Sequence, residues 1–274
     1  MMDHYPWTYA TDALWAVVRP HLPALPAPKR ADRPGRPRLD DRRCLEGLLF
    51  VAHAGLAWNA LPRALRVGSP RTLRRRLALW QGAGCWAAVH AAILEAMDNA
   101  GRIDWTRLAM DSSTVRAVGT GADPDGQATG PSPVDRGRPG SKHVLMVAGA
   151  RALPIAATVE PANRNDKATV ARLLAAVPEA LRHRLRGATV YADRGYDSPK
   201  VRAQVEAAGA TARVARTGEA HGSGLGKIRW PVEQAHSTLH NRRSLLVRRE
   251  RLKLMAEGML LMVVAVATFI KSIC

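Results

Sequence analysis

Two hydrophobic patterns divide the sequence near residue 104 and restrict the folds that the chain can adopt. Before this point apolar residues recur at helical spacing, as Leu45, Leu48 and Ala52 do. From residue 105 onward, short strand-like runs alternate with helical segments. That alternation predicts an α/β fold with a mixed sheet flanked by helices, preceded by a mostly helical domain. We therefore expect a helical domain over residues 1–103 and an α/β domain over 104–274.

The same patterns predict the individual elements. Helices are expected over 12–22, 41–54, 71–80 and 85–100, and then over 166–177, 198–208 and from Pro231 to the end of the chain. Strands are expected over 107–118, 143–148, 154–159, 188–192 and 210–214. Ser69 can cap the third helix, because Pro70 suits the first helical position.

The charge of the chain points to a polyanionic partner. Lys and Arg total 41 against 23 Asp and Glu, a formal net charge of +18, and the basic residues are spread along the whole length. Nucleic acid is the natural partner of such a chain. A GC-rich genome would also enrich arginine and alanine without any such partner. Charge alone therefore nominates DNA without establishing it.

Two basic segments are candidates for DNA contacts. Residues 35–38 form a flat Gly-Arg-Pro-Arg strip that can enter a minor groove, although a solvated linker explains them equally well. The helix expected over 71–80 follows another helix and a turn, which resembles a helix-turn-helix reader, with a solvated arginine-rich face as the alternative. Its arginines are Arg71, Arg74, Arg75 and Arg76.

Cysteine usage and hydropathy bear on the compartment. The three cysteines form an odd set without close pairing, which argues against a disulfide framework or a zinc site and favours a reducing cytoplasm. The N-terminus lacks the pattern of a secretory signal. The longest apolar run, 259–270, falls short of the roughly 20 residues that span a bilayer. We expect it to form a buried C-terminal helix, with no membrane role.

Two aspartates follow or interrupt strand-like runs. Asp193 comes directly after the apolar run 189–192 and precedes a glycine turn, and Asp111 lies within the strand expected over 107–118. Ligands in α/β sheets gather at such strand ends. A single acid there is more often a turn or cap residue, but two in one sheet of a strongly basic protein indicate a ligand site.

A third acid, Glu233, lies further along the chain. Pro231 can open a helix and would place Glu233 in its first turn, where it could lean toward the sheet. A glutamate in a first turn often only complements the helix dipole. We favour a ligand role for Glu233 because the two strand aspartates are also present. Asn163 and Asp166 either order a substrate loop or cap the helix that begins near them, and we favour capping.

Several segments resemble, in order and spacing, the insertion-sequence DDE transposases of bacteria. They are MDSSTVRA (110–117), PANRND (161–166), VYADRGYDS (190–198), RWPVEQAHSTLHNRR (229–243) and, in the N-terminal half, LDDRRCLEGLLFVAHAGLAWNALP (39–62). The similarity covers nearly the whole chain. It implies an RNase H-like catalytic core and gives Asp111, Asp193 and Glu233 as the catalytic, metal-binding acids.

The segment around the third acid departs from the family signature Tyr-x-x-Arg-x-x-x-Glu. Arg229 and Glu233 match it, but Gly226 stands where tyrosine is expected, and His240 stands where a basic residue is expected seven places after the glutamate. Arg242 and Arg243 lie close enough to substitute. These departures concern DNA contacts and leave the three acids in place.

The resemblance also implies a reaction. Carboxylates suit Mg²⁺ or Mn²⁺ rather than zinc, and two ions about 4 Å apart would activate the attacking oxygen and stabilise the leaving 3′ oxygen. The implied substrate is double-stranded DNA: the ends of an insertion sequence are cleaved, and their 3′-hydroxyls are then joined to target DNA. Pairing two ends implies at least a homodimer.

Candidate phosphate contacts outside the helical domain share a positive or titratable side chain near the acids, with solvated surface as the alternative for each. They are Lys142, His143, Arg194, Arg229, Arg242 and Arg243. Two further functions stay open: a metal-dependent nuclease of the same fold that cuts without joining, and a non-catalytic DNA-binding relic.

Overall fold

The computed structural model describes residues 9–25, 38–118, 128–215 and 225–273, with the backbone alone for 225–229. The helices before the sheet are α1 (Asp12–Val18), α2 (Asp41–Ala54), α3 (Pro70–Gly82) and α4 (Cys85–Asn99). The strands are β1 (Arg107–Ala117), β2 (Gly130–Pro131), β3 (Pro139–Ala148), β4 (Leu153–Pro161), β5 (Thr189–Ala192), β6 (Thr211–Val214) and β7 (Val247–Arg248). The later helices are α5 (Val170–Ala175), α6 (Pro199–Ala207), α7 (Leu225–His240) and α8 (Lys253–Ile273).

The strands form one mixed sheet, which confirms the predicted fold class. Its order is β2-β3-β1-β5-β6, with β4 also paired to β3 and β7 to β1. The pairs β1–β3 and β3–β4 are antiparallel, whereas β1–β5 and β5–β6 are parallel. Nearly every residue of β3 and β4 is buried. These two strands are therefore covered on both faces, as continuous apolar runs predict.

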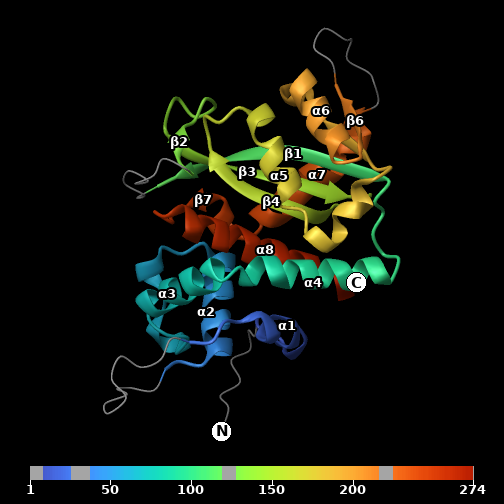
Figure 1. Ribbon diagram of the computed structural model, residues 1–274. Helices are drawn as coiled ribbons and strands as arrows, with labels where there is room; N and C mark the ends of the chain where they lie inside the picture. Colours follow the sequence, from blue (N-terminus) through green and yellow to red (C-terminus); the bar gives the residue numbers. More distant parts are fainter. Residues whose placement is uncertain (1–8, 26–37, 119–127, 216–224, 274) are drawn as a thin grey trace.

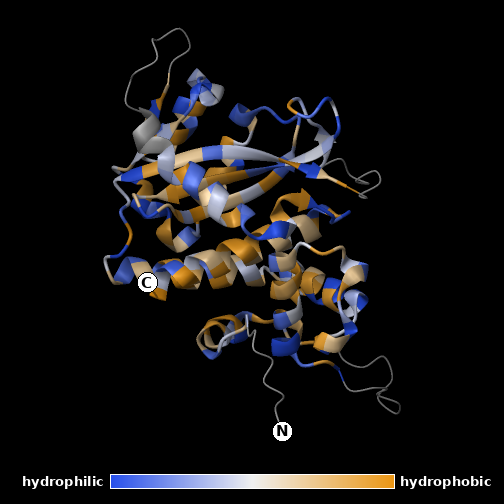
Figure 2. Ribbon diagram, turned by 180° about the vertical axis from the view of Figure 1, so that it is seen from behind, coloured by the Kyte–Doolittle hydropathy of each residue, from blue (hydrophilic) through white to orange (hydrophobic). Residues whose placement is uncertain are grey.

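The helices surround this sheet in layers (Figure 1). Helix α5 lies over one face and α7 over the other, while α8 runs between β4 and the helices α3 and α4. Figure 2 shows hydrophobic residues gathered along α8 and α4. One cluster of buried side chains extends from α1 to α8, so the N-terminal helices and the sheet share a core. The division into two domains at residue 103 stays a prediction.

Helix α8 is the buried C-terminal helix that the apolar run predicts. By length and composition it could cross a membrane, as could α3 and α4 together if their 61° bend lay within one span. However, 61% of the most apolar window of α8 is buried inside the fold. Its packing is therefore that of a core helix.

The segment around Pro231 differs from expectation. Helix α7 begins at Leu225, so Pro231 lies inside it and Glu233 is not in the first turn. The predicted continuous helix to the C-terminus is also wrong, because β7 separates α7 from α8. Strand β7 pairs with the end of β1, and the Arg248 guanidinium donates to the Ala128 carbonyl at 2.7 Å. This long-range pairing is invisible to local periodicity.

The predicted cap of α3 is present. The Ser69 hydroxyl accepts a hydrogen bond from the Thr72 amide at 3.2 Å, and Pro70 takes the first helical position. The helix expected over 166–177 is instead a 3-10 turn, η4 (Asp166–Ala168), followed by the short α5.

Gly55, which ends α2, gives a sharp test of packing between the two halves of the chain. Its φ is +64°, and an added Cβ would lie 2.5 Å from the Arg243 Cβ and 2.8 Å from the Arg243 carbonyl carbon. Left-handed backbone alone costs alanine roughly 1 kcal/mol. We expect Gly55→Ala to destabilise the fold by roughly 2 kcal/mol or more beyond that, because the added Cβ overlaps Arg243. Gly84→Ala is the matched control, because Gly84 has φ +72° and nothing within 4 Å of the same position. Urea denaturation of both variants measures the difference, and equal losses would contradict the packing.

His90 on α4 predicts a pH dependence of stability. Burial lowers its pKa from 6.5 to about 4, although a ring nitrogen lies 2.9 Å from the Pro154 carbonyl oxygen of β4. Because the pKa of His90 is lower in the folded state than in the unfolded state, protonation favours unfolding. The buried neutral ring therefore stabilises the fold fully above pH 6.5, and this contribution is lost as the pH falls toward 4. Between pH 7 and pH 4 the free energy of unfolding of the unaltered protein should fall by about 3 kcal/mol more than that of His90→Gln, since one pKa unit corresponds to about 1.4 kcal/mol. His183→Gln, at an exposed position, is the control variant, and equal pH profiles of the unfolding free energy for the two variants would contradict the role of His90.

Candidate active site

The register of two parallel strands brings Asp111 and Asp193 together. Ala109 of β1 is opposite Tyr191 of β5, so two residues further along Asp111 is level with Asp193, which directly follows β5. Neighbouring strands lie about 4.8 Å apart. Asp193 also shapes the next turn, η6 (Arg194–Tyr196), because its Oδ1 accepts a hydrogen bond from the Gly195 amide at 2.8 Å.

Helix α7, which carries Glu233, covers the same part of the sheet. It packs against β1, β3 and β5, and its buried His236 lies against the backbone of Asp111. Burial and the neighbouring His240 lower the pKa of His236 to about 4, which the Asp111 backbone partly opposes. Glu233 precedes His236 by three residues, about one helical turn, and its side chain is exposed.

The donor chemistry of these acids fits a hard divalent cation. Within the described residues, however, no group of three or more His, Cys, Asp or Glu side chains is already arranged to hold a metal ion. Asp111, Asp193 and Glu233 each interact with another group of the chain. The structure thus places two of the predicted acids in adjacent positions and the third on the covering helix, without assembling a three-ligand centre.

Tyr196 shows how closely the acids gather. Its side chain is 1% exposed, and burial raises the pKa of the hydroxyl well above its usual value. The charges of Asp166, Asp111 and Asp193 add to this rise, whereas a hydrogen bond with Ser112 opposes it. Three carboxylates therefore lie within electrostatic reach of one buried hydroxyl.

Asp166 belongs to this group, and its interpretation as a helix cap is wrong. Asn165 caps η4, since its side chain accepts from the Lys167 amide at 3.0 Å. The Asp166 Oδ1 instead accepts from the Ser112 hydroxyl and from Lys142 Nζ, each at 2.7 Å. The sequence signal was an acid shortly after a strand, the same signal that nominated Asp193. Asn163 does not cap a helix either, because its side-chain oxygen packs against Gly130 of β2.

The arginines of α3 divide between solvent and core. Arg71, Arg74 and Arg75 are exposed, whereas Arg76 is 7% exposed, forms an ion pair with Asp41 and donates to the Leu39 carbonyl at 3.0 Å. Burial lowers the pKa of Arg76. Its predicted role in DNA binding is therefore contradicted, because its side chain holds α3 to the start of α2.

The link between α2 and α3 also differs from a compact helix-turn-helix. Two short 3-10 turns, Trp58–Ala60 and Arg63–Leu65, lie between these helices. The turn of a helix-turn-helix has three or four residues. The exposed arginines of α3 thus stand on a helix that follows a longer connection.

Lys142 and His143 of β3 are not surface groups. The Lys142 side chain is 8% exposed and is bound to Asp166. His143 is 5% exposed, and burial lowers its pKa to about 3, with further lowering by His240, His236 and Arg248. A neutral ring beneath α7 cannot contact a phosphate in this conformation, so that prediction for His143 is wrong.

The other predicted contacts lie nearer the surface. Arg243 is exposed, and Arg242 is partly buried with its guanidinium 3.1 Å from His53 Nδ1 of α2. Arg194 is partly buried within η6. The Arg229 side chain and residues 35–37 lie outside the described part of the chain.

Comparisons with known proteins agree with this geometry. Residues 10–90 match a family model described as "Putative transposase of IS4/5 family", and residues 105–269 match one described as "Transposase DDE domain". The fold is accordingly RNase H-like. The chain belongs to the DDE-domain transposases, a family that acts on DNA and uses divalent metal ions.

Curated relatives cover parts of the chain. The chain is 44% identical over 110 residues to the "Insertion element IS402 uncharacterized 16.2 kDa protein" of Burkholderia cepacia. This match covers 40% of the chain and 74% of that protein. The chain is 47% identical over 127 residues to the "Putative transposase for insertion sequence element IS402" of the same organism, covering 45% of this chain and 60% of that protein.

Proposed function

We propose that this chain binds the terminal inverted repeats of an insertion sequence, cleaves the DNA at the element ends and joins the 3′-hydroxyl ends to target DNA. The observation that carries the proposal is the β1–β5 register, which sets Asp111 level with Asp193 in a chain that matches the DDE domain. Glu233 on the covering helix supplies the third acid.

Each acid is carried by a different element. Asp111 is carried by a central strand, Asp193 is held by the Gly195 amide, and Glu233 projects from a helix anchored by the buried Val232 and Ala235. We assign the metal site to these three carboxylates. When bound there, Mg²⁺ or Mn²⁺, as two ions, would offset the charge that develops on the attacking and leaving oxygens.

We assign the DNA contacts to exposed or partly buried arginines. Arg71, Arg74 and Arg75 follow helical spacing i, i+3, i+4 and so share one face of α3. Arg194, Arg229, Arg242 and Arg243 are the proposed phosphate contacts nearer the acids. Because two element ends must be held together, we propose a homodimer or larger assembly on DNA, working in the bacterial cytoplasm at the nucleoid.

Substituting the acids tests the catalytic assignment. Asp111→Asn, Asp193→Asn and Glu233→Gln should each lower DNA cleavage and joining by more than about 100-fold, since even outer-shell partners of a metal cost about 10- to 100-fold. The assay follows a supercoiled plasmid carrying the element ends, with and without Mg²⁺. Asp12→Asn is the control, because that side chain is 93% exposed and lies on α1.

The same assay separates the alternatives. Cleaved plasmid without inserted product in any condition would indicate a nuclease. Metal-independent binding without cleavage by the unaltered protein would indicate a DNA-binding relic.

Substituting the α3 arginines tests the DNA-binding face. Arg74→Ala and Arg75→Ala should each weaken binding to end DNA and reduce the slope of log K against log salt by about 0.9, the loss expected for one phosphate contact. Arg19→Ala makes the same charge change at another exposed position and should leave the slope unaltered. Fluorescence anisotropy over a salt series measures both quantities. Equal slopes of log K against log salt for all three variants would contradict DNA binding by this face of α3.

A further inference from the structure

One side chain, Asp166, links the two chain segments that carry the strand aspartates. Its Oδ1 accepts from the hydroxyl of Ser112, the residue next to Asp111, at 2.7 Å. Its other oxygen, Oδ2, faces the turn after β5: a Cβ built on Gly195 would lie 3.4 Å from Asp166 Oδ2 and 2.9 Å from Asp193 Oδ1. Asp166 therefore stands between strand β1 and the turn that Asp193 forms.

Lys142 ties the same carboxylate to a third strand. Its Nζ lies 2.7 Å from Asp166 Oδ1 and 2.8 Å from the Arg164 carbonyl oxygen. Because the lysine side chain is only 8% exposed, solvent screens this pair weakly. Loss of either partner would leave a poorly solvated charge, which is costly.

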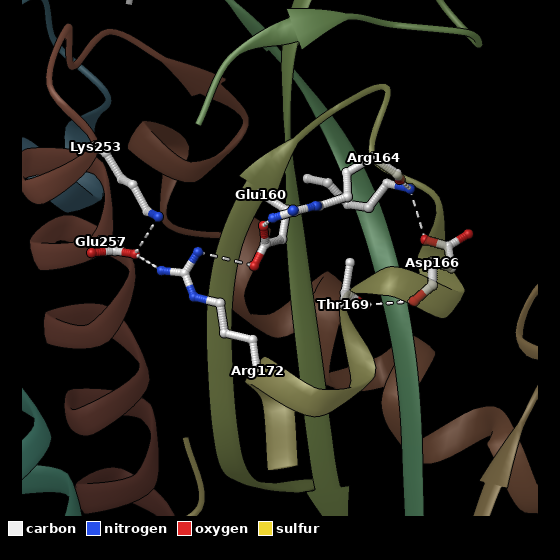
Figure 3. Close-up of polar contacts among 8 residues, drawn as sticks. Glu160, Arg164, Asp166, Thr169, Arg172, Lys253 and Glu257 are labelled. Carbon is white, nitrogen blue, oxygen red and sulfur yellow. Dashed lines mark hydrogen bonds and ion pairs between the residues drawn. The ribbon is translucent and has the colours of Figure 1, made fainter. Parts of the chain in front are cut away.

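The segment that presents Asp166 is itself anchored by ion pairs (Figure 3). Glu160, at the end of β4, has a fully buried side chain; its Oε2 lies 2.9 Å from Arg164 and its Oε1 lies 3.1 Å from Arg172. Arg172 also pairs with Glu257 of α8. The PANRND segment is thus bound to Glu160 on one side and to Ser112 of β1 and Lys142 of β3 on the other.

Tyr196 supplies a second, independent observation. Its hydroxyl is buried, and the hydrogen-bonding neighbour that affects its pKa is Ser112, which already donates to Asp166. A buried donor of this kind is costly unless a partner is available. The charges of Asp166, Asp111 and Asp193 act on this hydroxyl, so Asp166 belongs to the same group of carboxylates as the two predicted aspartates.

We propose that Asp166 is a positioning residue of the carboxylate centre: its bonds to Ser112 of β1 and Lys142 of β3 hold its carboxylate against the turn 193–197, and so keep Asp111 and Asp193 at the spacing that they need to share a cation. This inference rests on the proposed function. Asp166 acts through its neighbours, and its carboxylate is already committed to Ser112 and Lys142.

The first test measures the link without metal. Hydrogen exchange of the full-length protein should quicken on the order of 10-fold in the peptide 193–197 for Asp166→Ala, because local opening of the turn becomes easier. Asp98→Ala is the matched control: Asp98 is 8% exposed, pairs with Arg184 at 2.9 Å and accepts from Trp105 at 2.7 Å. Equal quickening of 193–197 in both variants would overturn the link.

The second test measures positioning by Mn²⁺ binding. Asp166→Asn should weaken Mn²⁺ affinity by about 10-fold, as the loss of an outer-shell partner does, while Asp98→Asn leaves it unaltered and Asp193→Asn abolishes it. In Asp166→Asn the buried Lys142 ammonium loses its partner. The double variant Lys142→Met, Asp166→Asn removes that charge, so it should regain thermal stability without regaining Mn²⁺ affinity. Recovery of affinity along with stability, or an unaltered affinity in Asp166→Asn, would reduce Asp166 to a structural residue and overturn the inference. Absence of saturable Mn²⁺ binding in the unaltered protein would overturn the metal site itself, and hydrogen exchange would still decide the link.

Discussion

The parallel pairing of β1 with β5 is the constraint on which the candidate site depends. Strand side chains alternate between faces, so a slip of one residue would turn either aspartate to the wrong side. Strand β5 spans only Thr189–Ala192, and its register is held by the fully buried Val190 and Ala192. On β1, Leu108 and Met110 are equally buried and precede Asp111. Apolar burial on two short segments therefore sets the position of two charged groups.

Local sequence patterns were sufficient for much of this framework. The strands β1, β4, β5 and β6 and the helices α2, α3 and α4 lie close to their predicted bounds, because hydrophobic periodicity and caps such as Ser69 act over a few residues. Strand β3 begins at Pro139, before its predicted start at 143, and the short β2 was not predicted. The beginning of α7 and the two-residue β7 were not predictable in this way. The first depends on a helix that tolerates Pro231 internally, and the second on pairing with the far end of β1.

The site shows the same division. Asp111 and Asp193 stand out because each is adjacent to an apolar strand, and that information is local. Asp166 was assigned to the wrong role because its partners Ser112 and Lys142 lie 54 and 24 residues away along the chain. Arg76 is an intermediate case: it directly precedes the buried Leu77 and lies three residues after the buried Leu73. Helical spacing alone could have separated it from the exposed arginines of α3.

The position of Glu233 bears on how the three acids could come together. Helix α7 is fastened to the sheet by Val232, Ala235 and Leu239, all of which are at most 2% exposed. Sliding the helix would uncover these side chains, and a fully buried valine or leucine side chain contributes about 1.5–3 kcal/mol. Glu233, by contrast, is exposed and has several staggered rotamers that differ little in energy. A rotation of this side chain costs far less than movement of the helix. The proposed three-acid centre would therefore be completed more easily by side-chain rearrangement around a cation and DNA than by any change of fold.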